Sequence, residues 1–234
     1  MAKHTKIVMV LDRSGSMKSI EQDTIGGVNQ FLADQKKIKG KAEMTLVLFD
    51  DQYDVVFEDV DIQDVKDLDN TTFVPRGWTA LLDAIGKTIN TTYSSVKSVK
   101  KKDRPEQVVF VVITDGMENH SREYTREAIF NMITEMKEKD KWEFMFLGAN
   151  QDAIDVGGQY GFVTGSSMTY AANEKGVSTS YALMSDKITT YRSLGKMVSF
   201  TDAERTKALG EDDEPKAKKR ENKAKAYGPG DKLV

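Results

Sequence analysis

Residues 6–16 read Lys6-Ile7-Val8-Met9-Val10-Leu11-Asp12-Arg13-Ser14-Gly15-Ser16, an apolar run that ends in a carboxylate and two hydroxyls. Such a run is typical of a central strand that is buried on both faces of a sheet. The polar side chains follow its C-terminal end, which is the edge at which open α/β sheets bind ligands. A cluster that contains only oxygen donors suits a hard cation such as Mg²⁺ better than zinc or copper.

Strands and amphipathic helices alternate along the rest of the chain. This alternation predicts an α/β fold with a doubly wound, mostly parallel sheet and helices on both faces. A tight turn at 50–52 joins two strands into a hairpin, which predicts one antiparallel edge strand. Besides 6–11, we expect strands at 44–49, 53–57, 107–113 and 142–148, and helices at 19–37, 79–96, 122–139 and within 169–195.

Several local features carry weaker predictions. Gly26-Gly27 lies inside the first helix, which suggests that this helix approaches the sheet closely. In the third helix, Phe130 is expected on the same buried face as Ile129, Ile133 and Met136. Shorter elements are expected as a helical turn at 62–66, a helix at 153–158 and an edge strand at 160–163.

The charge pattern divides the chain into two parts. Residues 1–200 are predicted to form one domain. The acidic block 211–214 and the basic stretch 216–225 follow, and they contain too few apolar residues to form a core. We therefore expect 201–234 to be a charged, disordered C-terminal tail.

Composition excludes several kinds of site. The chain has 234 residues, no cysteine and two histidines, so disulfides, thiolate catalysis and histidine-rich metal sites are ruled out. A net charge of -3 predicts no strong attraction to nucleic acid or to anionic membranes. The first apolar run is too short for a secretion signal or a membrane span. We expect a cytoplasmic protein, with a monomer favoured.

Two other segments are expected to place oxygen ligands beside the first strand. The strand at 107–113 leads into Thr114-Asp115-Gly116, and Thr79 lies at the start of a predicted helix. In a doubly wound sheet these edges can meet in one crevice. Asp12, Ser14, Ser16, Thr79 and Asp115 would then supply five of six octahedral positions around Mg²⁺, directly or through water, and leave one for a ligand.

This combination resembles the metal-ion-dependent adhesion site (MIDAS) of the von Willebrand factor type A (VWA) family, and the resemblance extends over roughly residues 5–195 in element order. It implies a Rossmann-like fold, and it implies that Ser14, Ser16 and Thr79 bind Mg²⁺ or Mn²⁺ while Asp12 and Asp115 bind it directly or through water. A Glu or Asp of a partner protein would complete the shell. The short form is similar to stand-alone bacterial and phage members. The family more often has a small residue where Trp78 stands.

Each of these residues also has a simpler interpretation. Asp12 and Ser14 could cap the turn into the first helix, and Thr79 could be a helix N-cap. Asn119 and His120 are either solvated loop residues or contacts at the rim of a bound ligand. At the same rim, Arg76 could attract a partner carboxylate, and Trp78 is either an exposed interface anchor or a buried tryptophan.

The function expected first is a metal-dependent protein-interaction module that is not an enzyme. One alternative is a structural component of a phage or cellular assembly, in which the ion only stabilises the fold. A Mg²⁺-dependent phosphoester hydrolase is disfavoured, because position 14 is serine rather than aspartate and no lysine or histidine is evidently placed to assist.

Overall fold

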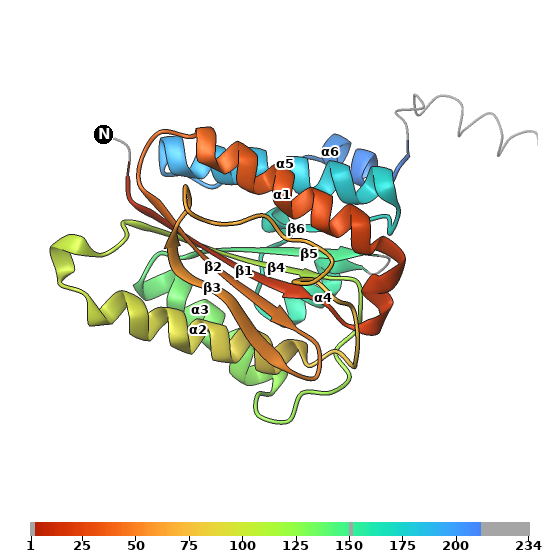
Figure 1. Ribbon diagram of the computed structural model, residues 1–234. Helices are drawn as coiled ribbons and strands as arrows, with labels where there is room; N and C mark the ends of the chain where they lie inside the picture. The colour runs from red at the N-terminus through yellow and green to blue at the C-terminus, as the bar shows by residue number, and fades with distance from the viewer. Residues whose placement is uncertain (1–2, 150–151, 212–234) are drawn as a thin grey trace, which may run out of the picture.

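A six-stranded sheet in the order β3-β2-β1-β4-β5-β6 forms the centre of the computed structural model, which describes residues 3–149 and 152–211 (Figure 1). All neighbouring strands are parallel except β2 and β3, which form the antiparallel pair. This is the predicted fold class. The strands are β1 (Thr5–Asp12), β2 (Ala42–Phe49), β3 (Tyr53–Asp61), β4 (Gln107–Thr114), β5 (Glu143–Ala149) and β6 (Ser167–Tyr170).

The two central strands are the ones with the most continuous apolar sequence. Every residue of β1 and of β4 is buried, as expected for strands covered by helices on both faces. Residues of β1 alternate between two cores, with Ile7, Met9 and Leu11 on one side and Val8 and Val10 on the other. The sheet is therefore covered by two separate layers.

The helices fill these two layers. α1, α5 and α6 contribute to the core on the Ile7 side, and α2, α3 and α4 to the core on the Val8 side (Figure 1). The α-helices are α1 (Glu21–Lys37), α2 (Leu81–Ser98), α3 (Arg126–Lys139), α4 (Ala153–Gln159), α5 (Glu174–Leu194) and α6 (Asp202–Ala208). Short 3₁₀ turns are η1 (Gly15–Ile20), η2 (Lys101–Asp103) and η3 (Thr164–Ser166).

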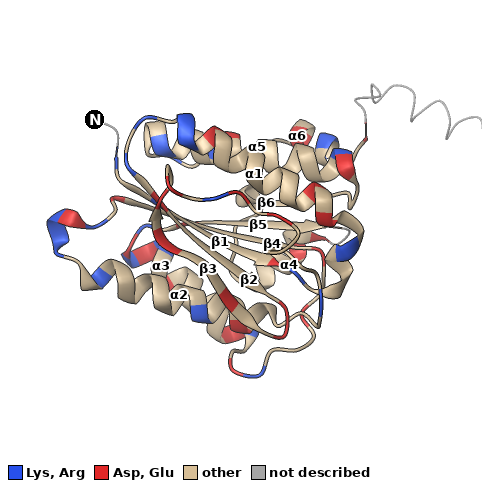
Figure 2. Ribbon diagram, in the orientation of Figure 1, with Lys and Arg blue, Asp and Glu red and all other residues tan. Residues whose placement is uncertain are grey.

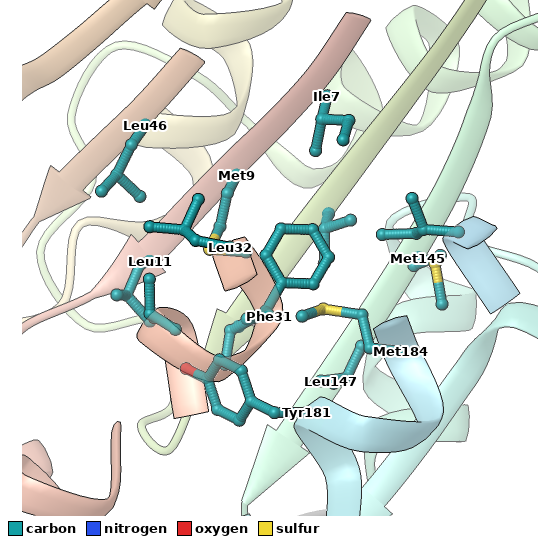
Figure 3. Packing of buried hydrophobic residues seen from close by; sticks show 14 of the residues in the cluster. Ile7, Met9, Leu11, Phe31, Leu32, Leu46, Met145, Leu147, Tyr181 and Met184 are labelled. Carbon is teal, nitrogen blue, oxygen red and sulfur yellow. The ribbon is translucent and has the colours of Figure 1, made fainter. Parts of the chain in front are cut away.

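Helix α1 approaches another helix closely, rather than the sheet as its glycines suggested. A Cβ added at Gly27 would lie 2.8 Å from the ring of Tyr181 in α5, whereas one added at Gly26 would meet nothing within 4 Å. Figure 3 shows Tyr181 close to Phe31 of α1, within the cluster of apolar side chains. The glycine at 27 is thus explained by the packing of α1 on α5.

Helix α3 begins four residues later than predicted. The amides of Arg122, Glu123 and Tyr124 donate to the carboxylate of Asp83 at 2.7–2.9 Å. This segment is therefore a loop bound to the first turn of α2, and the helix does not start there. Thr125 then caps α3 by accepting from the amide of Ala128. Phe130 was predicted to be buried, but it is exposed.

The edge strand predicted at 160–163 is wrong. Residues 160–163 form a turn and an extended segment, and the edge strand is β6 at 167–170, paired with β5. The helical turn expected at 62–66 is a hydrogen-bonded turn, and the helix at 153–158 is confirmed as α4.

The chain beyond residue 200 does not begin as a disordered tail. Thr201 and Glu204 form a capping box that starts α6. Lys187 of α5 binds Glu204 at 2.7 and 2.9 Å, and Ala208 is buried, so α6 belongs to the folded part. The predicted tail from 212 to 234 lies outside the described residues.

Charged residues lie mainly on helices and loops, with both signs mixed (Figure 2). Within the described ranges, 3–149 and 152–211, no helix is both long enough and apolar enough to cross a membrane.

Candidate metal-ion site

Three loops meet at the C-terminal edge of the sheet. β1 and β4 are parallel neighbours, with Leu11 opposite Ile113, so Asp12 and Thr114 end side by side. The chain then leaves β1 towards α1 on one face and leaves β4 towards α3 on the other. Strand order reverses at this point, and such switch points form the ligand crevice of open α/β sheets.

Five residues of two loops form a continuous hydrogen-bonded network. Asp12 accepts the amide hydrogen of Ser14 at 2.6 Å and the hydroxyl hydrogen of Thr114 at 2.5 Å. The Ser14 and Ser16 hydroxyl oxygens are 3.2 Å apart, and Ser16 donates to Asp115 at 2.6 Å. The loops after β1 and β4 are therefore joined through the predicted ligands.

Thr79 enters the same site from the third loop. A Cβ added at Gly116 would lie 2.9 Å from Thr79 Oγ1, 3.5 Å from Ser16 Oγ and 3.6 Å from Asp12 Oδ2. Oxygen atoms of two loops thus surround Gly116 of the third loop, and a side chain at position 116 would enter the space between them. The five predicted residues, Asp12, Ser14, Ser16, Thr79 and Asp115, are brought together.

The hydroxyls are not used as helix caps. Ser14 precedes η1 without making a side-chain cap bond, and the residue that precedes α2 is Ala80 rather than Thr79. In the first turn of α2, the amide of Leu82 donates instead to Glu118 at 2.9 Å, and the amide of Asp83 donates to Ser121 at 3.1 Å. The capping interpretation of Ser14 and Thr79 is therefore wrong, and their hydroxyls remain directed at the site.

The two carboxylates are held in an environment that opposes their charge. Burial raises the pKa of Asp12 to about 6, although hydrogen bonds from Thr114 and Ser14 act in the opposite direction. Burial also raises the pKa of Asp115 above its ordinary value, against the hydrogen bond from Ser16. The donors to Asp12 are an amide and a hydroxyl rather than a cationic side chain, so a bound cation would relieve the cost of burying these charges.

Only two of the five residues are carboxylates. Accordingly, the part of the chain that the structure describes contains no group of three or more His, Cys, Asp or Glu residues that could hold a metal ion. A site of this composition depends on hydroxyl oxygens, which hard cations such as Mg²⁺ and Mn²⁺ accept. The donor set fits such an ion.

The predicted rim residues have distinct positions. Asn119 accepts the amide hydrogen of Thr79 at 2.9 Å, and the amides of Asn119 and His120 donate to the carbonyl of Thr79 at 3.1 and 3.2 Å. These residues hold the backbone of Thr79. Trp78 is 63% exposed and stacks on His120 with 6.5 Å between ring centroids, so it is not the buried tryptophan of the second alternative.

Arg76 is already paired. Its Nε donates to Asp50 at 2.9 Å and its Nη2 donates to Gln52 at 2.9 Å, so its charge is largely compensated within the chain. Sequence reasoning missed Asp50 and gave no role to Thr114. The only signal for Thr114 is its position at the end of a strand that adjoins β1.

Comparisons with known proteins give the family. A sequence model of the von Willebrand factor type A domain matches residues 6–156, and no curated protein matches the chain. Among solved structures, proximal thread matrix protein 1 from the mussel byssus has a TM-score of 0.54 at 14% identity, with 80% of this chain and 46% of that chain covered. A form of it with a zinc-occupied MIDAS motif has a TM-score of 0.53 at 14% identity, with 86% and 49% covered.

A von Willebrand factor type A structure from Catenulispora acidiphila has a TM-score of 0.49 at 13% identity, with 79% of this chain and 42% of that chain covered. The chain thus spans less than half the length of these solved structures. The family model covers well over half of the chain, from β1 into α4. The chain belongs to the von Willebrand factor type A domain family.

Proposed function

We propose that this domain is a divalent-metal-dependent protein-interaction module and not an enzyme. Asp12, Ser14, Ser16, Thr79 and Asp115 would hold Mg²⁺ or Mn²⁺, directly or through water. The observation that carries the proposal is the meeting of three loops at one point, with hydroxyls that are free of capping roles. The mussel protein, which shares the fold and holds zinc in its MIDAS motif, is consistent with it.

A carboxylate of a partner protein is the ligand that we infer. Mg²⁺ takes six oxygen ligands, so five side chains leave at least one position. A bound ion would supply positive charge and an open coordination position at the exposed side of the site, where Ser16 is exposed. A Glu or Asp side chain is the protein group that matches this position in charge and in donor type.

The partner would also contact the apolar surface beside the site. Met117 is 69% exposed and follows Gly116, and Trp78 is exposed and precedes Thr79. Aromatic and methionine side chains next to a charged contact are typical of interface centres. We therefore expect Trp78→Ala to weaken partner binding while Mn²⁺ binding is retained.

Affinity capture tests the proposed function. Wild-type protein in Mg²⁺ should retain a partner that is lost in EDTA and is not captured by Asp12→Ala. Glu43→Gln is a matched control, because Glu43 forms an ion pair with Lys6 at the start of β2, the end opposite to the site. If Asp12→Ala retains every partner, the proposal is wrong. A rise in thermal stability with Mg²⁺, without any EDTA-sensitive partner, would favour the structural role instead.

A further inference from the structure

A buried carboxylate that is not one of the proposed metal ligands lies between two of the metal-binding loops. Asp50 follows β2 and has no exposed surface. Its Oδ2 accepts from Nε of Arg13 at 3.0 Å and from Nε of Arg76 at 2.9 Å, while its Oδ1 accepts the amide hydrogen of Gln52 at 2.6 Å. One carboxylate thus binds two guanidinium groups.

The two arginines belong to different loops of the site. Arg13 stands between Asp12 and Ser14, and Arg76 lies three residues before Thr79. Their side chains meet on Asp50, so this residue connects the loop after β1 with the loop before α2.

Backbone hydrogen bonds join the same three segments. The amide of Arg76 donates to the carbonyl of Arg13 at 2.8 Å, and the amide of Gly15 donates to the carbonyl of Gly77 at 3.3 Å. The amide of Ala80, next to Thr79, donates to the carbonyl of Asp50 at 2.9 Å. Asp50 therefore contacts the Thr79 loop through both its side chain and its backbone.

We propose that Asp50 is a positioning residue of the metal site, acting through Arg13 and Arg76. It sets the separation of the Ser14 and Thr79 hydroxyls, and it neutralises guanidinium charge beside the cation. The inference rests on the proposed function, because it presupposes that these hydroxyls bind an ion.

The charges of this group support both roles. Arg13 is buried, and it also binds Asp54, so two arginines are balanced by two carboxylates. Without Asp50, the buried guanidinium of Arg13 would keep only the half-exposed Asp54 as its counter-charge, and the excess positive charge would oppose binding of a divalent cation. Replacing a residue that orients metal ligands typically lowers the metal affinity by about 10- to 100-fold.

Asp50→Asn tests the proposal, because it keeps the shape of the side chain and removes the charge. We expect Mn²⁺ affinity, measured by electron paramagnetic resonance, to fall by at least about tenfold. In the metal-free protein, the amides of Gly15 and Ala80 should exchange hydrogen faster than in the wild type. Glu43→Gln, which disturbs an ion pair at the other end of β2, should leave both readouts unchanged.

A second variant covers the case in which Asp50→Asn does not fold. Arg76→Lys keeps the charge at a half-exposed position but loses the planar group that binds Asp50, so it should also lower Mn²⁺ affinity. Wild-type affinity in a folded Asp50→Asn or in Arg76→Lys would overturn the positioning role alone. The same follows if Glu43→Gln lowers the affinity equally. Absence of Mn²⁺ binding by the wild type would overturn the proposed function as well.

Discussion

Gly116→Ala places one methyl group among the proposed metal ligands. Its Cβ would lie 2.9 Å from Thr79 Oγ1, closer than carbon and oxygen atoms pack in proteins, and 3.5 Å from Ser16 Oγ. Gly116 does not have a positive φ, so the alanine backbone is allowed and the effect is steric. Because Asn119 and His120 hold the backbone of Thr79, the smallest response is rotation of the Thr79 hydroxyl away from the site.

The size of the effect follows from the cost of overpacking. Inserting a methyl group into a well-packed position costs about 1–3 kcal/mol. If the Thr79 hydroxyl rotates away and is lost as a ligand, and the affinity for Mn²⁺ decreases by this free energy, the affinity falls by about 5- to 150-fold. The free energy of unfolding of the metal-free protein should change by less, because the hydroxyl is then free to rotate.

Titration calorimetry with Mn²⁺ measures this change. Gly26→Ala is the matched control, since a Cβ there meets nothing within 4 Å and α1 lies outside the ligand set. It should bind Mn²⁺ with wild-type affinity. If Gly116→Ala also binds Mn²⁺ as tightly as the wild type, the reasoning that these three loops hold the ion is refuted.

Two further predictions concern stability. Gly27→Ala should lower the free energy of unfolding in urea by about 1–3 kcal/mol, because its Cβ would collide with the ring of Tyr181; an unchanged or higher stability would contradict the packing described. Burial acts to raise the pKa of Glu43, but the hydrogen bond from His4 and the charge of Lys6 outweigh it and lower the pKa below 4.5. The stability that this carboxylate contributes is therefore fully present above pH 4.5 and is lost as pH falls through its folded pKa, so urea titrations of Glu43→Gln should show a smaller loss over that range than wild type.

The central part of the fold was predictable because its sequence is unambiguous. β1 and β4 are continuous apolar runs, and only burial on both faces of a sheet accommodates such runs in strands of this length. The hairpin of β2 and β3 was likewise marked by its tight turn. Asp12 ends β1 and Asp115 directly follows β4, so their meeting at one edge could be deduced from the parallel arrangement.

The errors arose where distant residues determine local structure. The start of α3 depends on Asp83, which takes the amides of residues 122–124, and this contact has no sequence signal. β6 has only four residues, with a serine and a threonine, and it is a strand because it pairs with β5. α6 was predicted to be tail because it has few apolar residues, and its ion pair with α5, between Glu204 and Lys187, has no sequence signal.

In the candidate site, too, some features follow from the local sequence and others depend on distant residues. For Ser14 and Thr79 the sequence left capping open as the simpler alternative, since serine and threonine are common caps, and the structure shows that Glu118 and Ser121 bind the first-turn amides of α2. The pairing of Arg13 and Arg76 on Asp50 depends on two hydrogen bonds between residues that are 37 and 26 positions apart. Such contacts can be assigned only once the loops are placed.

Mn²⁺ binding by the wild type and by Asp12→Ala, compared by electron paramagnetic resonance, tests the central claim most directly. The account predicts one bound ion per wild-type chain, displaced by Mg²⁺, and no specific binding by Asp12→Ala. Equal binding by the two proteins, or no binding by the folded wild type, would contradict it.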